Sequence, residues 1–156
     1  MVATTTPVRT VSHGTFSVER TYNVSPARVF AAWASKQAKA RWFAGAAQDP
    51  TYENDFRIGG REYSSGEAPG GDVSFTYEAH YQDIVPDTRI IYSYVMHING
   101  NRTSVSIGTV DLKAAGKGTR LVYTEQGAFL DGFDNPAERE EGTRQLLDAL
   151  GKELAS

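Results

Sequence analysis

The amino-acid sequence predicts an α+β protein in which a curved antiparallel β-sheet wraps around one long C-terminal helix. Three observations indicate this fold: segments of alternating apolar and polar side chains fill the middle of the chain, turn residues separate them, and one apolar stripe at helical spacing ends the sequence. Strands joined by short turns pair in antiparallel fashion. Helices that are segregated from the strands along the chain are typical of α+β proteins.

The first elements that the sequence predicts are a strand and two short helices. Residues 14–22 alternate between apolar and polar side chains, a pattern typical of a half-buried strand. Ser25 and Pro26 follow, which supply a side-chain oxygen at the N-cap and a proline at the first helical position. Trp33 then lies on the apolar face of the first helix, and the second helix covers residues 36–43.

Turn residues divide the middle of the chain into further strands. Gly59 and Gly60 form one such signal, and Asn99 followed by Gly100 strongly indicates a tight hairpin. With these boundaries we predict strands over residues 51–58, 61–65, 73–85, 89–98, 102–112 and 119–126. Together with the first strand they would form a sheet six or seven strands wide.

The last predicted element is the long C-terminal helix. Asn135 supplies a cap, Pro136 the first helical position and Glu138 an acid at the third, which together come close to a capping box. The side chains that repeat at helical spacing after this start are Leu146, Leu147, Leu150 and Leu154, and Thr143 and Arg139 continue the same stripe one and two turns earlier.

Length and composition indicate a single domain. We expect residues 1–13 to be a flexible tail without the apolar core of a secretory signal, and residues 14–156 to form the domain. The absence of cysteine excludes disulfides and thiolate metal sites. A net charge of −3 with scattered Lys and Arg argues against a nucleic-acid partner, and no apolar run approaches the ~20 residues that span a membrane. These features predict a cytoplasmic monomer or homodimer.

Several motifs occur together with a spacing that resembles one protein family. They are Asp-Phe-Arg-Ile-Gly-Gly-Arg at 55–61, Tyr-Gln-Asp-Ile-Val-Pro-Asp at 81–87, Gly-Thr-Arg-Leu at 118–121 and Thr-Glu-Gln-Gly at 124–127, preceded by Trp33 and Trp42. From about residue 14 to residue 154, the chain resembles the branch of the START-like, polyketide-cyclase-like (SRPBCC) superfamily that is named after the activator of heat-shock protein 90 ATPase.

This resemblance implies the helix-grip fold, in which a strongly bent antiparallel sheet grips the C-terminal helix and leaves a deep cavity between them. Relatives in the superfamily carry lipids, hormones or polyketides, some cyclise or hydrolyse bound compounds, and one branch stimulates a chaperone ATPase. The sequence departs from many relatives at Gly142 and Thr143, since a tryptophan often follows this glycine. The missing indole would enlarge the cavity, unless a neighbouring side chain fills the space.

The residues themselves also predict a hollow beneath the helix. One leucine-striped helix cannot cover the whole concave face of so broad a sheet, and the chain supplies many aromatic side chains, as in apolar ligand pockets. The alternative is that these side chains simply pack the core. The candidate cavity or ligand-binding residues are Trp33, Trp42, Phe43, Phe56, Glu62, Tyr63, Phe75, Tyr77, Tyr92, Tyr94, Tyr123, Glu125, Phe129, Phe133, Leu146, Leu147 and Leu150.

Glu125 is the most specific of these candidates. It shares the strand parity of Leu121 and Tyr123, which places its carboxylate on the inner face of the sheet. A carboxylate in an apolar cleft can act as a general acid or base, and when buried it needs a donor such as a Tyr hydroxyl or an Arg. The alternative is a glutamate at the rim, paired with an arginine. Glu62 is a second candidate, and its alternation with Tyr63 leaves one of the two inward.

No motif indicates a metal or another cofactor. His13, His80 and His97 have neither the i, i+4 spacing of helical metal ligands nor the i, i+2 spacing of strand ligands. The sequence also lacks a Gly-x-Ser-x-Gly nucleophile elbow and a phosphate-binding loop. We therefore predict no metal and no cofactor.

Three functions remain open, and the sequence favours the first. This is the binding of a small hydrophobic or amphipathic molecule, with neither nucleic acid nor membrane as a partner. The second is an enzyme of cyclase, aromatase or hydrolase type with Glu125 as acid or base, although no set of nucleophile, base and orienting group is visible. The third is a stress-related co-regulator of a chaperone ATPase, which would be expected to carry a broad charged docking surface.

Overall fold

One antiparallel sheet holds every strand in the described part of the chain, which is residues 8–45, 48–68 and 70–156 of the computed structural model. The elements follow one another in the order that the sequence predicts. They are β1 (Val11–Tyr22), α1 (Pro26–Ala34), α2 (Lys36–Trp42), β2 (Gln48–Asn54), β3 (Arg61–Glu67), β4 (Ser74–Val85), β5 (Arg89–Ile98), β6 (Asn101–Ala115), β7 (Gly118–Leu130) and α3 (Pro136–Ala155).

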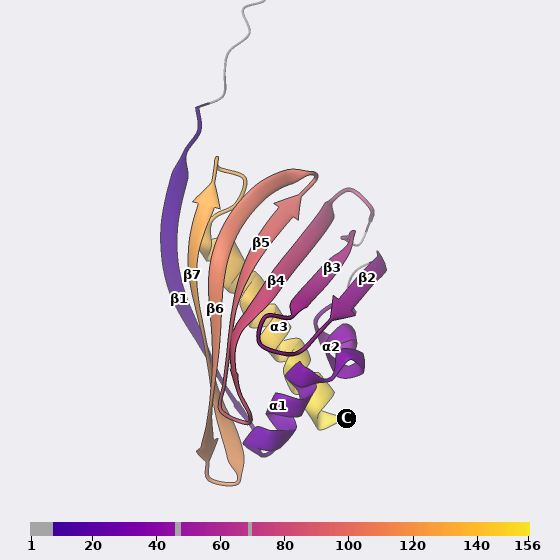
Figure 1. The fold of residues 1–156 in the computed structure, drawn as a ribbon, viewed down its shortest axis with the longest axis vertical. Coiled ribbons are helices and arrows are strands. Elements are labelled where there is room, and N and C mark those ends of the chain that lie inside the picture. Colours follow the sequence, from indigo (N-terminus) through magenta and orange to yellow (C-terminus); the bar gives the residue numbers. More distant parts are fainter. Residues whose placement is uncertain (1–7, 46–47, 69) are drawn as a thin grey trace, which may run out of the picture.

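The sheet bends around α3. Its seven strands lie in the order β1-β7-β6-β5-β4-β3-β2, and every neighbouring pair is antiparallel. The long helix α3 crosses one face of the sheet diagonally, and α1 and α2 lie beside its C-terminal part (Figure 1). The predicted α+β class and helix-grip arrangement are confirmed.

Local sequence signals set the starts of the helices and the hairpin as predicted. The Ser25 side chain accepts a hydrogen bond from the Arg28 amide at 3.2 Å, and the Asn135 side chain accepts one from the Glu138 amide at 3.0 Å. Asn99 and Gly100 have φ of 50° and 80°, as the tight turn between β5 and β6 requires.

Some boundaries differ from the prediction. β1 begins at Val11, so residues 11–13 pair with β7 and belong to the sheet, which makes the predicted tail boundary at residue 13 wrong. Residues 1–7 of the predicted tail lie outside the described residues. β2 ends at Asn54 instead of residue 58, because the Gly60 amide donates to the Arg57 carbonyl oxygen at 2.8 Å and closes a turn.

Gly108 on β6 lets two tyrosine side chains approach the sheet backbone closely. It pairs with Tyr92 on β5 and Glu125 on β7. A Cβ atom at this position would lie 2.7 Å from the Tyr92 ring and 2.8 Å from Tyr123 Oη. The glycine therefore gives the space that the inner face of the sheet needs for aromatic side chains.

Replacing Gly108 with alanine is expected to lower the free energy of unfolding by about 1–3 kcal/mol, because the added methyl group overpacks the core. Urea denaturation followed by circular dichroism measures the change. Gly142→Ala is the control, since its added Cβ meets nothing within 4 Å and a helical glycine-to-alanine change stabilises by about 0.5–1 kcal/mol. Equal stability of Gly108→Ala and the unmutated protein would contradict this role of the glycine.

Candidate ligand-binding site

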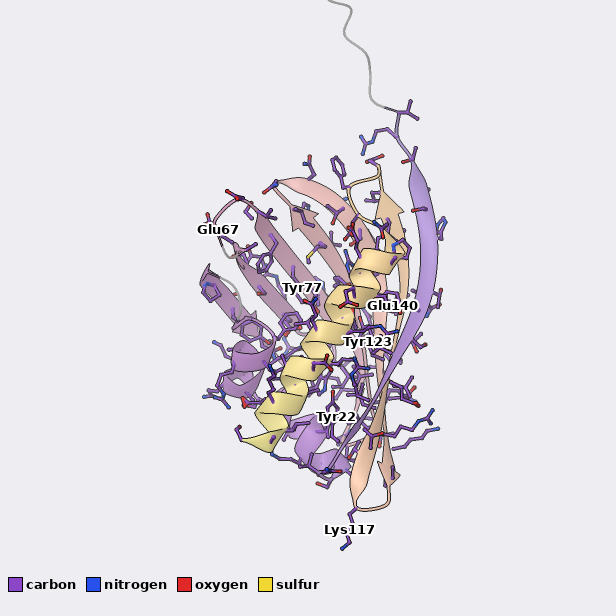
Figure 2. The ribbon with its side chains drawn as sticks, turned by 180° about the vertical axis from the view of Figure 1, so that it is seen from behind. Tyr22, Glu67, Tyr77, Lys117, Tyr123 and Glu140 are labelled. Atoms are coloured by element: carbon purple, nitrogen blue, oxygen red, sulfur yellow. The ribbon has the colours of Figure 1, made fainter. Side chains whose placement is uncertain are left out.

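A pocket of about 210 Å³ lies between α3 and the inner face of the sheet. Figure 2 views the molecule from the side of α3, with Tyr77 and Tyr123 close to the helix. Most of the pocket wall is aromatic or aliphatic, and a few charged side chains complete it. The lining residues are Trp33, Trp42, Tyr77, Tyr92, Tyr94, Met96, Tyr123, Glu125, Asp134, Glu138, Arg139, Gly142, Thr143, Leu146 and Leu147.

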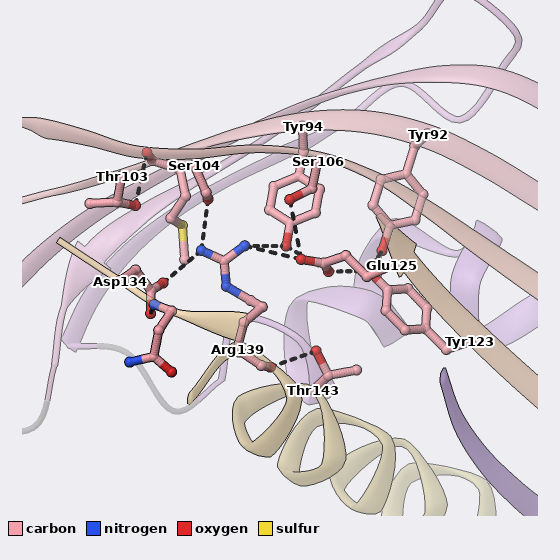
Figure 3. A network of polar contacts seen from close by, with 12 residues as sticks. Tyr92, Tyr94, Thr103, Ser104, Ser106, Tyr123, Glu125, Asp134, Arg139 and Thr143 are labelled. Carbon is pink, nitrogen blue, oxygen red and sulfur yellow. Dashed lines mark hydrogen bonds and ion pairs between the residues drawn. The ribbon is translucent and has the colours of Figure 1, made fainter. Parts of the chain in front are cut away.

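Glu125 is the centre of the polar part of this wall (Figure 3). Its side chain is 1% exposed. Tyr94 and Tyr123 donate to Oε1 at 2.8 and 2.7 Å, and Ser106 and Arg139 donate to Oε2, both at 3.2 Å. A carboxylate offers about four lone-pair sites, so these four donors use the hydrogen-bonding capacity of Glu125 fully. Glu125 is buried on the inner face, as its strand parity predicts, and it pairs with an arginine, as in the alternative, but away from the rim.

Arg139, in the first turns of α3, connects the helix to the sheet. Its Nη1 donates to Tyr94 Oη at 2.6 Å, and its Nη2 donates to Ser104 Oγ at 2.7 Å and to Asp134 Oδ2 at 2.8 Å. Burial lowers the pKa of Arg139, but Tyr94 and the carboxylates of Glu125 and Asp134 outweigh burial and raise the pKa above its ordinary value. The guanidinium is therefore held charged inside the protein.

Four tyrosines from β4, β5 and β7 form a continuous row in the wall. The ring centroids of Tyr77 and Tyr94 lie 4.9 Å apart, those of Tyr92 and Tyr94 lie 5.9 Å apart, and Tyr92 donates to Tyr123 Oη at 3.2 Å. Burial raises the pKa of each of these hydroxyls above its ordinary value of 10.0. They act as neutral hydrogen-bonding groups with large apolar rings.

A second buried ion pair lies behind the aromatic wall. Lys39 Nζ on α2 is 2.7 Å from Glu62 Oε2 and 2.8 Å from Oε1 on β3, and the two side chains are 1% and 0% exposed. Tyr52 and Tyr77 also donate to Glu62. The ammonium lies 5.0 Å from the ring centroid of Trp33. Burial lowers the pKa of Lys39, and the attraction of Glu62 opposes this shift.

Nine of the predicted residues line the pocket. They are Trp33, Trp42, Tyr77, Tyr92, Tyr94, Tyr123, Glu125, Leu146 and Leu147. That these side chains contact a ligand stays a prediction.

The other predicted residues lie outside the pocket wall. The Phe43 ring packs 5.0 Å from that of Tyr77, and the Phe56 ring packs 5.0 Å from that of Tyr81. Phe129 and Leu150 are buried in the core, Phe75 is half-buried near the start of β4, and Glu62 is the partner of Lys39. These residues support the wall from behind or extend the core.

Tyr63 and Phe133 point elsewhere, each for a local reason. Glu62 occupies the inner face of β3, so Tyr63 faces the other side, where the Arg61 guanidinium lies 4.6 Å from its ring centroid. Phe133 is 50% exposed because Asp131 and Gly132, with φ of 56° and 71°, turn the chain sharply between β7 and α3.

The polar residues of α3 and the preceding loop were not among the predicted site residues. Asp134, Glu138 and Arg139 all line the pocket, as do Gly142 and Thr143. The sequence does contain a signal for Arg139, which lies on the leucine stripe of the C-terminal helix. A charged side chain on an apolar stripe needs a buried partner. Asp134 has no comparable signal, since it lies in a loop.

This arrangement suits binding better than proton transfer. The general base must have a lone pair within reach of the substrate proton, whereas the lone-pair sites of Glu125 are taken by protein donors. Within the described residues, no group of three or more His, Asp or Glu side chains could hold a metal ion. None of the helices in that part of the chain is long and apolar enough to cross a membrane.

Comparison with known proteins shows the family of this chain. The model of the family described as activator of Hsp90 ATPase homolog 1-like protein matches residues 23–155. The chain belongs to this family. The matched residues include the motifs at 55–61 and 81–87, and the helix-grip fold is consistent with this family. No curated protein matches the chain significantly.

Solved structures resemble this member of the family along nearly its whole length. The structure of an uncharacterized protein from Rhizobium leguminosarum is 42% identical with a TM-score of 0.89, and it matches 95% of this chain and 98% of its own. The Mll3558 protein from Rhizobium loti is 49% identical with a TM-score of 0.86, over 92% and 99% of the two chains. CalU16 from Micromonospora echinospora shares the fold. It is 18% identical with a TM-score of 0.68, over 94% of this chain and 86% of its own.

Proposed function

We propose that this protein binds a compact, partly apolar small molecule in the pocket between α3 and the sheet. The observation that carries the proposal is the lining of that pocket, in which aromatic and aliphatic side chains surround a few fixed polar groups. Binding sites for small molecules have this composition. The helix-grip fold of the family is compatible with the same function.

The pocket volume limits the size of the ligand. At about 210 Å³ the pocket is smaller than the several hundred Å³ usual for drug-sized ligands. A cavity of about 150 Å³ is large enough to bind benzene. We therefore expect a molecule with a single ring or a short branched chain, rather than a fatty acid or a polyketide.

The two tryptophans of the chain provide a direct test, because both Trp33 and Trp42 line the pocket. Titration with benzyl alcohol, a single-ring probe, is expected to change the intrinsic tryptophan fluorescence in a saturable manner. In Thr143→Trp the new indole would fill the pocket from α3, so fluorescence is unsuitable and calorimetry replaces it. We expect this variant to lose at least about tenfold in affinity, which corresponds to about 1.4 kcal/mol.

Thr143→Val is the matched control, since it keeps the side-chain volume and removes only the hydroxyl that donates to the Arg139 carbonyl oxygen at 3.0 Å. We expect this variant to bind the probe with nearly unchanged affinity. Equal binding by Thr143→Trp and the unmutated protein would contradict a site in this pocket.

A further inference from the structure

We propose that the ligand is an organic cation, namely a protonated amine attached to a compact apolar group. This inference rests on the proposed function, because it concerns the same pocket. Three features of the wall carry it: the balance of charges, the direction of the hydrogen bonds and the aromatic faces.

The charges that line the pocket are predominantly negative. Three carboxylates, from Glu125, Asp134 and Glu138, face one guanidinium, from Arg139. Arg139 is already paired with Glu125 at 3.2 Å and with Asp134 at 2.8 Å. A ligand anion would have to compete with these two fixed carboxylates, whereas a cation would reduce the excess negative charge.

Among the tyrosines of the wall, the hydrogen bonds leave acceptors rather than donors for a ligand. Glu125 can only accept, so the hydroxyls of Tyr94 and Tyr123 direct their protons toward it. Tyr92 in turn donates to Tyr123, which leaves lone pairs on Tyr92 Oη for a ligand N–H. The indole N–H of Trp33 has no partner in the described chain, but protein atoms cover it.

The aromatic wall already stabilises cations from within the protein. The Lys39 ammonium lies 5.0 Å from the Trp33 ring centroid and 5.8 Å from that of Tyr92. The Arg139 guanidinium lies 5.6 Å from the Tyr94 ring centroid. All three distances are in the range of cation–π attraction. Glu62 neutralises Lys39 at 2.7 Å, so the Lys39 ammonium adds no uncompensated positive charge beside the aromatic rings of the pocket wall.

Three single-ring probes of similar size but different charge test this inference. They are benzylamine, which is a cation at neutral pH, benzyl alcohol, which is neutral, and benzoate, which is an anion. Calorimetry at pH 7 is expected to give benzylamine an affinity about tenfold higher than benzyl alcohol, from one to two desolvated cation–π contacts. Benzoate is expected to show no measurable binding.

Charge removal at the pocket wall provides the second measurement. Glu138→Gln is expected to lower the affinity ratio of benzylamine to benzyl alcohol by about twofold to fivefold, as for the loss of a partly screened charge. Glu141→Gln, also exposed on α3 but not in the pocket lining, is expected to leave the ratio unchanged. An equal ratio in these two variants would contradict the charge argument.

The possible failures are distinguishable. Equal affinity for the amine and the alcohol, or tighter binding of benzoate, would overturn the preference for a cation and leave the pocket as a binding site. Absence of binding by all three probes would overturn both the preference and the proposed function.

Discussion

Lys39→Met is expected to lower the free energy of unfolding by about 3–5 kcal/mol, the usual cost of leaving one member of a buried ion pair without its partner. Lys39 and Glu62 are 1% and 0% exposed, and the carboxylate would keep only the hydroxyls of Tyr52 and Tyr77 as donors. Methionine has a similar length and leaves little empty space. Urea denaturation of the variant measures the loss.

Two further variants separate the charge effect from the change of shape. Adding Glu62→Gln to Lys39→Met removes the unpaired charge, and we expect the double variant to recover a large part of the lost stability. Lys36→Met, on the exposed side of the same helix, is expected to change stability by less than about 0.5 kcal/mol. A loss below about 1 kcal/mol in Lys39→Met would show that the pair is not buried as described.

Stability is expected to fall steeply above pH 10. The pKa values of Tyr77, Tyr92, Tyr94 and Tyr123 are raised in the folded protein, mainly by burial, from an ordinary value of 10.0. The unfolded chain therefore releases these protons at lower pH than the folded chain does. Their contribution to stability is complete below pH 10 and is lost as the pH rises above it, by about 1.4 kcal/mol per pH unit for each tyrosine.

The lowered pKa of Lys39 changes stability in the opposite direction. Stability rises as the pH increases from the pKa of Lys39 in the folded protein toward its ordinary value of 10.5. One lysine cannot offset four tyrosines at higher pH. A domain stability of about 5–15 kcal/mol would thus be exhausted within a few pH units. Circular dichroism and the ultraviolet absorbance of tyrosinate should change together in one cooperative transition. Gradual tyrosine ionisation near pH 10, with the circular dichroism signal intact, would contradict the buried tyrosine row.

Strand parity predicts which side chains of the central strands face inward, because alternate residues of a strand lie on the same face of the sheet and one face is buried. Tyr92 and Tyr94 on β5, and Tyr123 and Glu125 on β7, are all buried as the alternation indicates. Turn chemistry likewise predicts the hairpin at Asn99. These are local properties, and a single sequence contains them.

The partners of the buried charges depend on tertiary structure and could not be read in the same way. Lys39 lies in a short helix where a lysine is usually solvated, and only the packing of α2 on the sheet brings it to Glu62. Arg139 and Glu125 are likewise joined only when α3 packs on the inner face of the sheet. The helical stripe indicates that Arg139 is on the apolar face, but not which carboxylate it meets.

The size of the pocket also depends on side-chain packing. The broad sheet and single helix predict a wide hollow, but the tyrosine row and the Lys39–Glu62 pair fill much of it and leave about 210 Å³. Aromatic side chains that line a cavity and aromatic side chains that fill it have the same strand parity. Side-chain rotamers and strand register decide whether the side chains line the cavity or fill it, and a sequence pattern determines neither the rotamers nor the register.

The central claim, that this remaining pocket binds a compact ligand, is tested most directly by nuclear magnetic resonance. The chain has two tryptophans, Trp33 and Trp42, and both lie in the pocket wall, so the two indole N–H signals report on this site. Titration with benzylamine should shift both signals along saturable curves with one dissociation constant. Binding that shifts surface amides and leaves both indole signals in place would contradict the claim.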